Sequence, residues 1–126
     1  MSLPCVPELP MPSLAELVAD LAARPGVTTV VVASPDGLPI RSAGQSLDAE
    51  ALAALTVTIA RGSARLGDAG RIGAVARYVV ECANGLAIGG VIRDGNWLLV
   101  LAEPSADIGQ LLFELRQEGP ALAAQL

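Results

Sequence analysis

Three short apolar segments, joined by Asn-Gly and Asp-Gly, constrain the fold of this chain most strongly. The segments read AVARYVVECA, LAIGGVIR and NWLLVLA, and the dipeptides Asn84-Gly85 and Asp94-Gly95 separate them. Such dipeptides are typical of two-residue type I′ turns, whose central positions need φ above zero. The sequence therefore predicts an antiparallel meander whose register places Val79 opposite Gly90, and Gly90 opposite Leu99. Both faces of this meander are mostly apolar, so both need cover.

A second hairpin precedes the meander. Residues 27–33 are β-branched and apolar, and Ser34-Pro35-Asp36-Gly37 has the composition of a tight turn. The return strand, residues 38–43, contains Pro39, which cannot donate to a ladder and so indicates an edge strand. Residues 74–83 pair in sequence only with the next strand, so we expect them at the other edge.

Three amphipathic helices complete the chain. The first follows a capping box at Ser13 and ends before Pro25-Gly26. The second begins at Ser46 or Asp48 and runs to about residue 66. The third occupies residues 105–118 and ends at Gly119-Pro120. The element order α-β-β-α-β-β-β-α predicts a three-layer α/β/α domain with a five-stranded, mainly antiparallel sheet.

The central helix has two apolar faces, where a surface helix needs one. Leu52, Leu55, Ile59 and Leu66 share one face, which we assign to the protein's own core. A stripe of small residues forms the other, where the backbone of a second helix could approach closely; the alternative is that it meets a loop or water. The predicted contact residues of this stripe are Ala53, Val57, Ala60 and Ala64.

The strand at residues 74–83 offers a second self-complementary surface. An open apolar edge is an aggregation hazard unless it is covered, and pairing with its own copy across a two-fold axis would cover it. Arg77 and Glu81 lie four residues apart on one face and could pair with their symmetry mates, or could be plain exposed residues. The predicted interface residues here are Val75, Arg77, Val79 and Glu81.

Charge and composition narrow the function classes. The net charge is −5, all eight cations are arginines, and the chain has no lysine or histidine. The acidic balance argues against nucleic acid and against an anionic membrane surface as partners. The missing residues exclude a P-loop and the usual general base, so we expect no enzyme.

The two cysteines and the N-terminal segment carry little chemistry. Cys5 and Cys82 have no metal-ligand spacing, so we expect neither a metal nor a cofactor. No signal peptide or membrane span is visible, so we expect a cytoplasmic protein. Residues 1–12 contain four of the nine prolines and are predicted to be an extended arm before a domain at 13–126.

Taken together, three segments resemble the roadblock family, the dynein light chain roadblock type and its bacterial relatives. They are GVTTVVVASPDGLPI, SLDAEALAALTVTIA and VVECANGLAIGGVIRDGNWLLVLAEPSADIGQLLFEL. The resemblance implies a dimer with a continuous ten-stranded sheet and paired central helices. It also implies that a small Ras-like GTPase binds at those helices, as in the bacterial branch of the family. On this resemblance Glu50, Arg61 and Arg65 are the candidate partner-binding residues, unless they are merely solvated.

Two other functions remain open from the sequence. Trp97, Tyr78 and Gly90 could line a hollow in a small-ligand sensing domain, although three aromatic residues in the whole chain support a shaped pocket poorly. The chain could also be a structural subunit of a larger complex.

Overall fold

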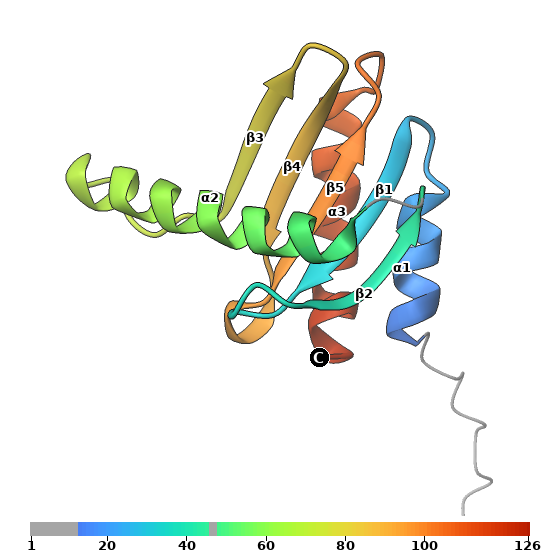
Figure 1. Ribbon diagram of the computed structural model, residues 1–126, viewed down its shortest axis with the longest axis horizontal. Coiled ribbons are helices and arrows are strands. Elements are labelled where there is room, and N and C mark those ends of the chain that lie inside the picture. The colour runs from blue at the N-terminus through green and yellow to red at the C-terminus, as the bar shows by residue number, and fades with distance from the viewer. Residues whose placement is uncertain (1–12, 46–47) are drawn as a thin grey trace, which may run out of the picture.

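A computed structural model describes residues 13–45 and 48–126. The predicted order of elements is confirmed within these residues: three α-helices flank a single antiparallel sheet of five strands in the order β2-β1-β5-β4-β3 (Figure 1). The predicted edge strands, the one with Pro39 and the first of the meander, are the two edges of this sheet. The elements are α1 (Leu14–Ala22), β1 (Val27–Ala33), β2 (Pro39–Gly44), α2 (Ala49–Ala69), β3 (Arg77–Cys82), β4 (Gly85–Val91), β5 (Trp97–Ala102) and α3 (Ile108–Ala124).

The sheet separates two apolar cores. Helices α1 and α3 cover one face, where Leu17, Val18 and Leu122 pack against alternate residues of β1, β4 and β5. Helix α2 alone crosses the other face (Figure 1). Alternation along the central strands explains this division, because successive side chains of a strand point to opposite faces.

Side-chain caps fix where the helices begin. Ser13 Oγ accepts the Glu16 backbone N–H at 3.2 Å, as the capping box predicts. Asp48 caps α2 by accepting the Ala51 N–H at 3.1 Å, and Asp107 caps α3 in the same way. Of the two predicted starts of α2, Asp48 is therefore confirmed, while Ser46 and the predicted arm at 1–12 lie outside the described residues.

The predicted register of the meander is wrong at both turns. Ala83 and Asn84 form the first turn, and Cys82 pairs with Gly85, so Val79 lies opposite Ile88. The second loop has three residues, Arg93–Gly95, closed by a 2.8 Å bond from the Ile92 N–H to the Asn96 carbonyl.

The second error has the larger consequence. Asp94 has φ 60° and Gly95 has φ 78°, so the left-handed positions that we predicted do occur, but in a longer loop. The extra residue slides β5 by one position, and Leu99 pairs with Gly89 instead of Gly90. A one-residue slip moves every side chain of a strand to the opposite face, so Trp97 and Leu99 lie under α2.

Helix α3 continues past its predicted end at Gly119-Pro120 and stops at Ala124. Pro120 lacks an N–H and removes one backbone hydrogen bond inside the helix. Leu122, two residues later, is fully buried in the core beneath α1 and α3. Burying this leucine side chain contributes about 2 kcal/mol, which offsets the lost bond.

Candidate protein-binding surface on α2 and β3

The inner face of α2 is the stripe of small residues. Ala53, Val57 and Ala60 are at most 6% exposed and pack against Val31 and Leu99 of the chain's own sheet. The assignment of these three residues to a dimer contact is therefore wrong, because their side chains are covered within the protomer. Ala64, one turn further along the same stripe, is half-buried.

The other apolar face of α2 points away from the core, which reverses our assignment of the two faces. Leu55 is 56% exposed, Ile59 37% and Leu66 69%, while Leu52 is half-buried. At 100° per residue these four lie along one flank of the helix. We call Leu52, Leu55, Ile59 and Leu66 the apolar flank.

A packing argument explains the reversal. The sheet face below α2 carries the large side chains of Tyr78 and Trp97, whose ring centroids are 5.8 Å apart. Small residues on the helix leave room for these rings, whereas leucines there would overpack the core. Large aromatic groups on the sheet thus select the small stripe of the helix.

Tyr78 also ties α2 to the edge strand. Its hydroxyl forms a buried hydrogen bond with the hydroxyl of Thr56 in the middle of α2. Burial raises the pKa of the Tyr78 phenol above its ordinary value, and the bond to Thr56 acts in the opposite direction. Because the pKa of Tyr78 is higher in the folded than in the unfolded protein, the protonated phenol stabilises the fold. This stabilisation is fully present below the ordinary tyrosine pKa of about 10 and is lost as the pH rises through the raised value.

Tyr78→Phe is expected to lower the free energy of unfolding by about 1 kcal/mol at pH 7, because it leaves the buried Thr56 hydroxyl without this partner. Between pH 9 and pH 11 the variant should lose less stability than the parent, since Tyr78 is the one tyrosine of the chain. Urea unfolding of both proteins at each pH measures the two differences. Parallel pH profiles would contradict the assigned role of the phenol.

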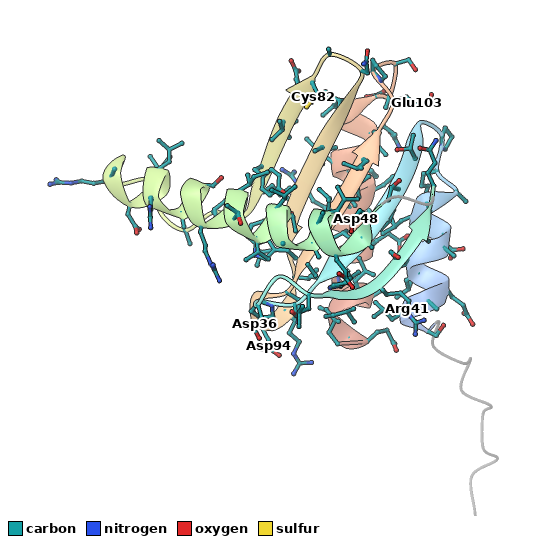
Figure 2. All side chains as sticks on the ribbon, in the orientation of Figure 1. Asp36, Arg41, Asp48, Cys82, Asp94 and Glu103 are labelled. Atoms are coloured by element: carbon teal, nitrogen blue, oxygen red, sulfur yellow. The ribbon has the colours of Figure 1, made fainter. Side chains whose placement is uncertain are left out.

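The sheet face beside α2 is only partly covered. Figure 1 shows α2 crossing the strands away from the β3–β4 turn, with its C-terminal end projecting beyond β3. An open hollow of about 650 Å³ lies near that turn, with Thr28, Ala87 and Leu101 among its lining residues. Cys82 and Glu103, which also line it, mark this end of the sheet in Figure 2, opposite Asp36 and Asp94.

A second groove, of about 380 Å³, lies on the other side of α2. Its lining includes Arg61 and Asp68 of α2 together with Pro35 and Gly95, which lie at the Asp36 and Asp94 end of the sheet. The flank of α2 with Arg61 therefore faces that end, and the apolar flank faces the hollow near Cys82.

The three predicted partner-binding residues lie on the flank of α2 that faces the second groove. Glu50, Arg61 and Arg65 are all exposed, and at 100° per residue they fall within one sector of the helix. Along the axis Glu50 and Arg61 are about 16 Å apart at 1.5 Å per residue, so the glutamate does not contact the arginines. We call Glu50, Arg61, Arg65 and Asp68 the charged flank.

Strand β3 presents the remaining predicted contact residues at an open edge. Arg77, Val79 and Glu81 are exposed, and Val75, just before the strand, is half-buried. Nothing within the described residues pairs with the outer side of β3. The projecting end of α2 and this edge therefore lie on one side of the molecule (Figure 1).

The residues proposed for a ligand hollow do not meet in one. Tyr78 and Trp97 are buried under α2, whereas Gly90 lines a groove on the opposite face with Arg77 and Arg116. The described residues contain no group of three cysteine or acidic side chains placed to hold a metal ion. No helix in the described part of the chain has both the length and the apolar character to cross a membrane.

Comparison with known proteins identifies the family. The model of the Roadblock/LC7 domain family matches residues 14–102. The chain belongs to the Roadblock/LC7 family. Within this Roadblock/LC7 domain, the matched region spans α1 to β5 and so includes all of α2 and the β3 edge.

Solved structures agree with this membership. A Roadblock/LC7 domain from Streptomyces avermitilis is 29% identical, with a TM-score of 0.82, over 90% of this chain and 97% of that one. MglB from Myxococcus xanthus shares the fold at 18% identity and TM-score 0.81, over 88% and 85% of the two chains. The gliding protein MglB of Thermus thermophilus shares the fold at 14% identity and a TM-score of 0.79, over 89% of this chain and 87% of that one. Comparison with curated protein sequences finds no match.

The sequence predicted the edge position of β3 in this Roadblock/LC7 domain, but the apolar flank was assigned to the core. The sequence analysis did not predict that Leu55, Ile59 and Leu66 are exposed. The aromatic pair on the sheet is the signal that could have found them, because two large rings below a helix require small residues above. That signal depends on placing Trp97 on the α2 face, which the predicted register did not.

Proposed function

We propose that this Roadblock/LC7 domain is a homodimeric interaction module that regulates or scaffolds a small Ras-like GTPase and supplies no catalytic group of its own. The observation that carries the proposal is the exposed apolar flank of α2, which lies beside an uncovered sheet face and an open strand edge. Apolar surface of this kind on one side of a small domain marks an interaction site.

A second copy fits the apolar surface. A two-fold axis at the β3 edge would carry the projecting end of each α2 over the sheet of the other copy. The partner's helix would then lie along the apolar flank and above the hollow near Ala87 and Leu101. One self-complementary patch is sufficient for such a contact, and it would also cover the open edge.

The charged flank remains outside this contact. At 100° per residue, Arg61 and Arg65 lie about 80° or more from the residues of the apolar flank, so a dimer through that flank would leave both arginines exposed. Among the described residues, neither arginine takes part in an ion pair within the chain. Unpaired guanidinium groups are well suited to bind carboxylates of a protein partner.

Family membership supports a small Ras-like GTPase as that partner. The resemblance to bacterial roadblock proteins implies a small Ras-like GTPase that contacts the paired central helices. The solved relatives include MglB proteins, and one of them is described as MglB with a tetrameric arrangement, which supports self-association in that protein. These likenesses support a regulatory role, and the charged flank provides its binding surface.

The test is capture of each small Ras-like GTPase encoded in the source genome, loaded with GDP or with a non-hydrolysable GTP analogue. The immobilised parent should retain one of them in a nucleotide-dependent way. Arg61→Glu with Arg65→Glu should lower its affinity tenfold or more, because the reversal replaces attraction by repulsion at the contact.

A charge-matched control distinguishes the loss of a local contact from a general effect of net charge on binding. Arg41 and Arg116 are exposed on other elements, and their double reversal changes the charge by the same amount. This control should bind the GTPase like the parent. Equal loss in both double variants would remove the charged flank from the proposal, and retention of none of the GTPases by the parent would overturn the proposed partner.

A further inference from the structure

The sequence of the predicted arm, residues 1–12, repeats with a period of three. From Leu3 onward it reads LPC, VPE and LPM, so each triplet begins with an apolar residue that a proline follows. A polyproline II helix has three residues per turn, and proline favours its backbone angles. In that conformation Leu3, Val6 and Leu9 would form one apolar edge, the prolines a second edge, and Glu8 would belong to the third. The repeat therefore predicts a ligand with an apolar edge and an acidic edge.

An open groove between α3 and β4 offers a surface that matches these edges. It has a volume of about 250 Å³ and lies on the face of the sheet opposite α2. Buried Leu98 and half-buried Ile92 and Leu115 line its inner part. Arg77 and Arg116 line it as well, and both are exposed. Among the described residues neither arginine takes part in an ion pair, so the groove combines an apolar floor with unpaired cations at its rim.

Two glycines leave the walls of this groove open. Gly90 lies in β4 and Gly119 lies inside α3, where glycine is less favourable than alanine. Among the described residues, a methyl group at Gly119 would have no atom within 4 Å, and one at Gly90 would have only the Arg77 Cγ, at 3.7 Å. Packing within the described chain therefore requires neither glycine, whereas the close approach of a bound backbone would require both.

An exposed aromatic ring lies beside the groove. Phe113 of α3 is 56% exposed, whereas Tyr78 and Trp97 are buried under α2. At 100° per residue, Phe113 shares one side of α3 with Arg116 and Pro120, which line the groove. Grooves that bind polyproline II segments present exposed aromatic side chains, against which the prolines pack.

The start of α1 is close enough for the arm to reach this groove. Leu14 at the start of α1 and Leu126 after α3 pack against the same core cluster, and Figure 1 shows these two helix ends at the same end of the molecule. The groove lies across α3 from α1, and packed helices are about 8–10 Å apart, so it lies about 20 Å from Ser13. At 3.1 Å per residue, Val6 would lie about 22 Å from Ser13 along a polyproline II segment. The chain between them is therefore long enough to place Val6 in the groove.

We propose that residues 3–11 bind this groove of their own chain as a polyproline II segment. Leu3, Val6 and Leu9 face the apolar floor, and Glu8 lies beside the arginines at the rim. A weak contact is sufficient, because the tether holds the arm near the groove at about millimolar effective concentration. The site lies on the face opposite α2, so it leaves the charged flank accessible and does not depend on the proposed dimer or GTPase.

A spin label on Cys5 tests where the arm lies. In a Cys82→Ser background Cys5 is the one cysteine of the chain, and it lies outside the apolar edge. In the isotope-labelled full chain, the nitroxide should broaden the amide signals of Ile92 and Leu115 relative to the same sample with the nitroxide reduced. The amide signal of Arg61, on the opposite face, should keep its intensity. Absence of broadening at Ile92 and Leu115 would overturn the proposal.

Matched variants test the apolar edge. Val6→Asp places a carboxylate against the floor and should abolish the broadening at Leu115, because an unpaired charge is costly to bury. Met11→Asp adds the same charge on the edge of Glu8 and should retain the broadening. Retained broadening in Val6→Asp, or equal loss in both variants, would exclude the apolar edge as the contact. Circular dichroism verifies the fold of each variant.

A mixed sample tests which copy the arm binds. It combines isotope-labelled chain without a spin label and spin-labelled chain without isotopes. The amide signals of the groove should keep their intensity in this mixture, because each arm occupies the groove of its own chain. Broadening at Leu115 there would show that the arm binds another copy and would overturn the assignment to its own chain.

Discussion

Gly89→Ala will lower the free energy of unfolding by about 3 kcal/mol, because a methyl group at this position overlaps the ring of Tyr78. Tyr78 cannot yield easily, since its ring packs on Trp97 and its hydroxyl bonds to Thr56 under α2. Relief of the overlap therefore requires the helix, the ring or the strand to shift. Urea unfolding at fixed protein concentration measures the loss.

The neighbouring glycine supplies the matched control. A methyl group at Gly90 would have the Arg77 Cγ at 3.7 Å as its nearest atom, which is an ordinary van der Waals contact. Gly90→Ala makes the same chemical change one residue away in the same strand and should alter stability by less than about 1 kcal/mol. Similar losses in the two variants would show that the backbone of β4, and not the Tyr78 ring, sets the cost.

Ile59→Glu will raise the dissociation constant of the proposed dimer by a factor of about 100 or more. The substitution places a carboxylate on the apolar flank of both copies, and an unpaired charge buried in an interface costs several kcal/mol. Ile59 is 37% exposed in the single chain, so the protomer should still fold. Light scattering over a dilution series measures the mass, and circular dichroism verifies the fold.

Thr58→Glu is the control for this second experiment. Thr58 precedes Ile59 in α2, is exposed, and lies at 100° from it, on the side of the charged flank. The variant loses the hydrogen bond from the Thr58 hydroxyl to the Ala54 carbonyl, which affects the helix alone. It should dimerise like the parent, and a dimer that tolerates Ile59→Glu would exclude the apolar flank as the contact.

The order and type of the elements could be predicted from local signals. Caps at Ser13 and Asp48, the turn at Ser34–Gly37 and the proline in β2 each act within a few residues of their own position. The Gly37 N–H bonds to the Ser34 carbonyl at 2.9 Å, as the composition of that turn predicts. Both edges of the sheet followed from the same kind of evidence.

Features that depend on contacts distant in sequence could not be predicted in this way. The three-residue loop at Arg93–Gly95 contains both residues of the predicted two-residue turn, and the two differ in how β4 and β5 pair, as in Leu99 with Gly89. The faces of α2 depend in turn on that register, because it brings Trp97 beneath the helix. The prediction for α2 used the helix pattern alone and therefore lacked this information.

The hydrogen bond between Tyr78 and Thr56 has a mechanical consequence for the proposed assembly. It joins the middle of α2 to β3, the strand at the proposed contact between copies. Neither element can therefore shift alone without breaking a buried hydrogen bond. If the proposed GTPase contact and the proposed dimer contact favour the same position of α2, each binding equilibrium would strengthen the other by the same factor. In that case the Tyr78–Thr56 hydrogen bond would make the affinity for the proposed GTPase depend on whether the domain is monomeric or dimeric.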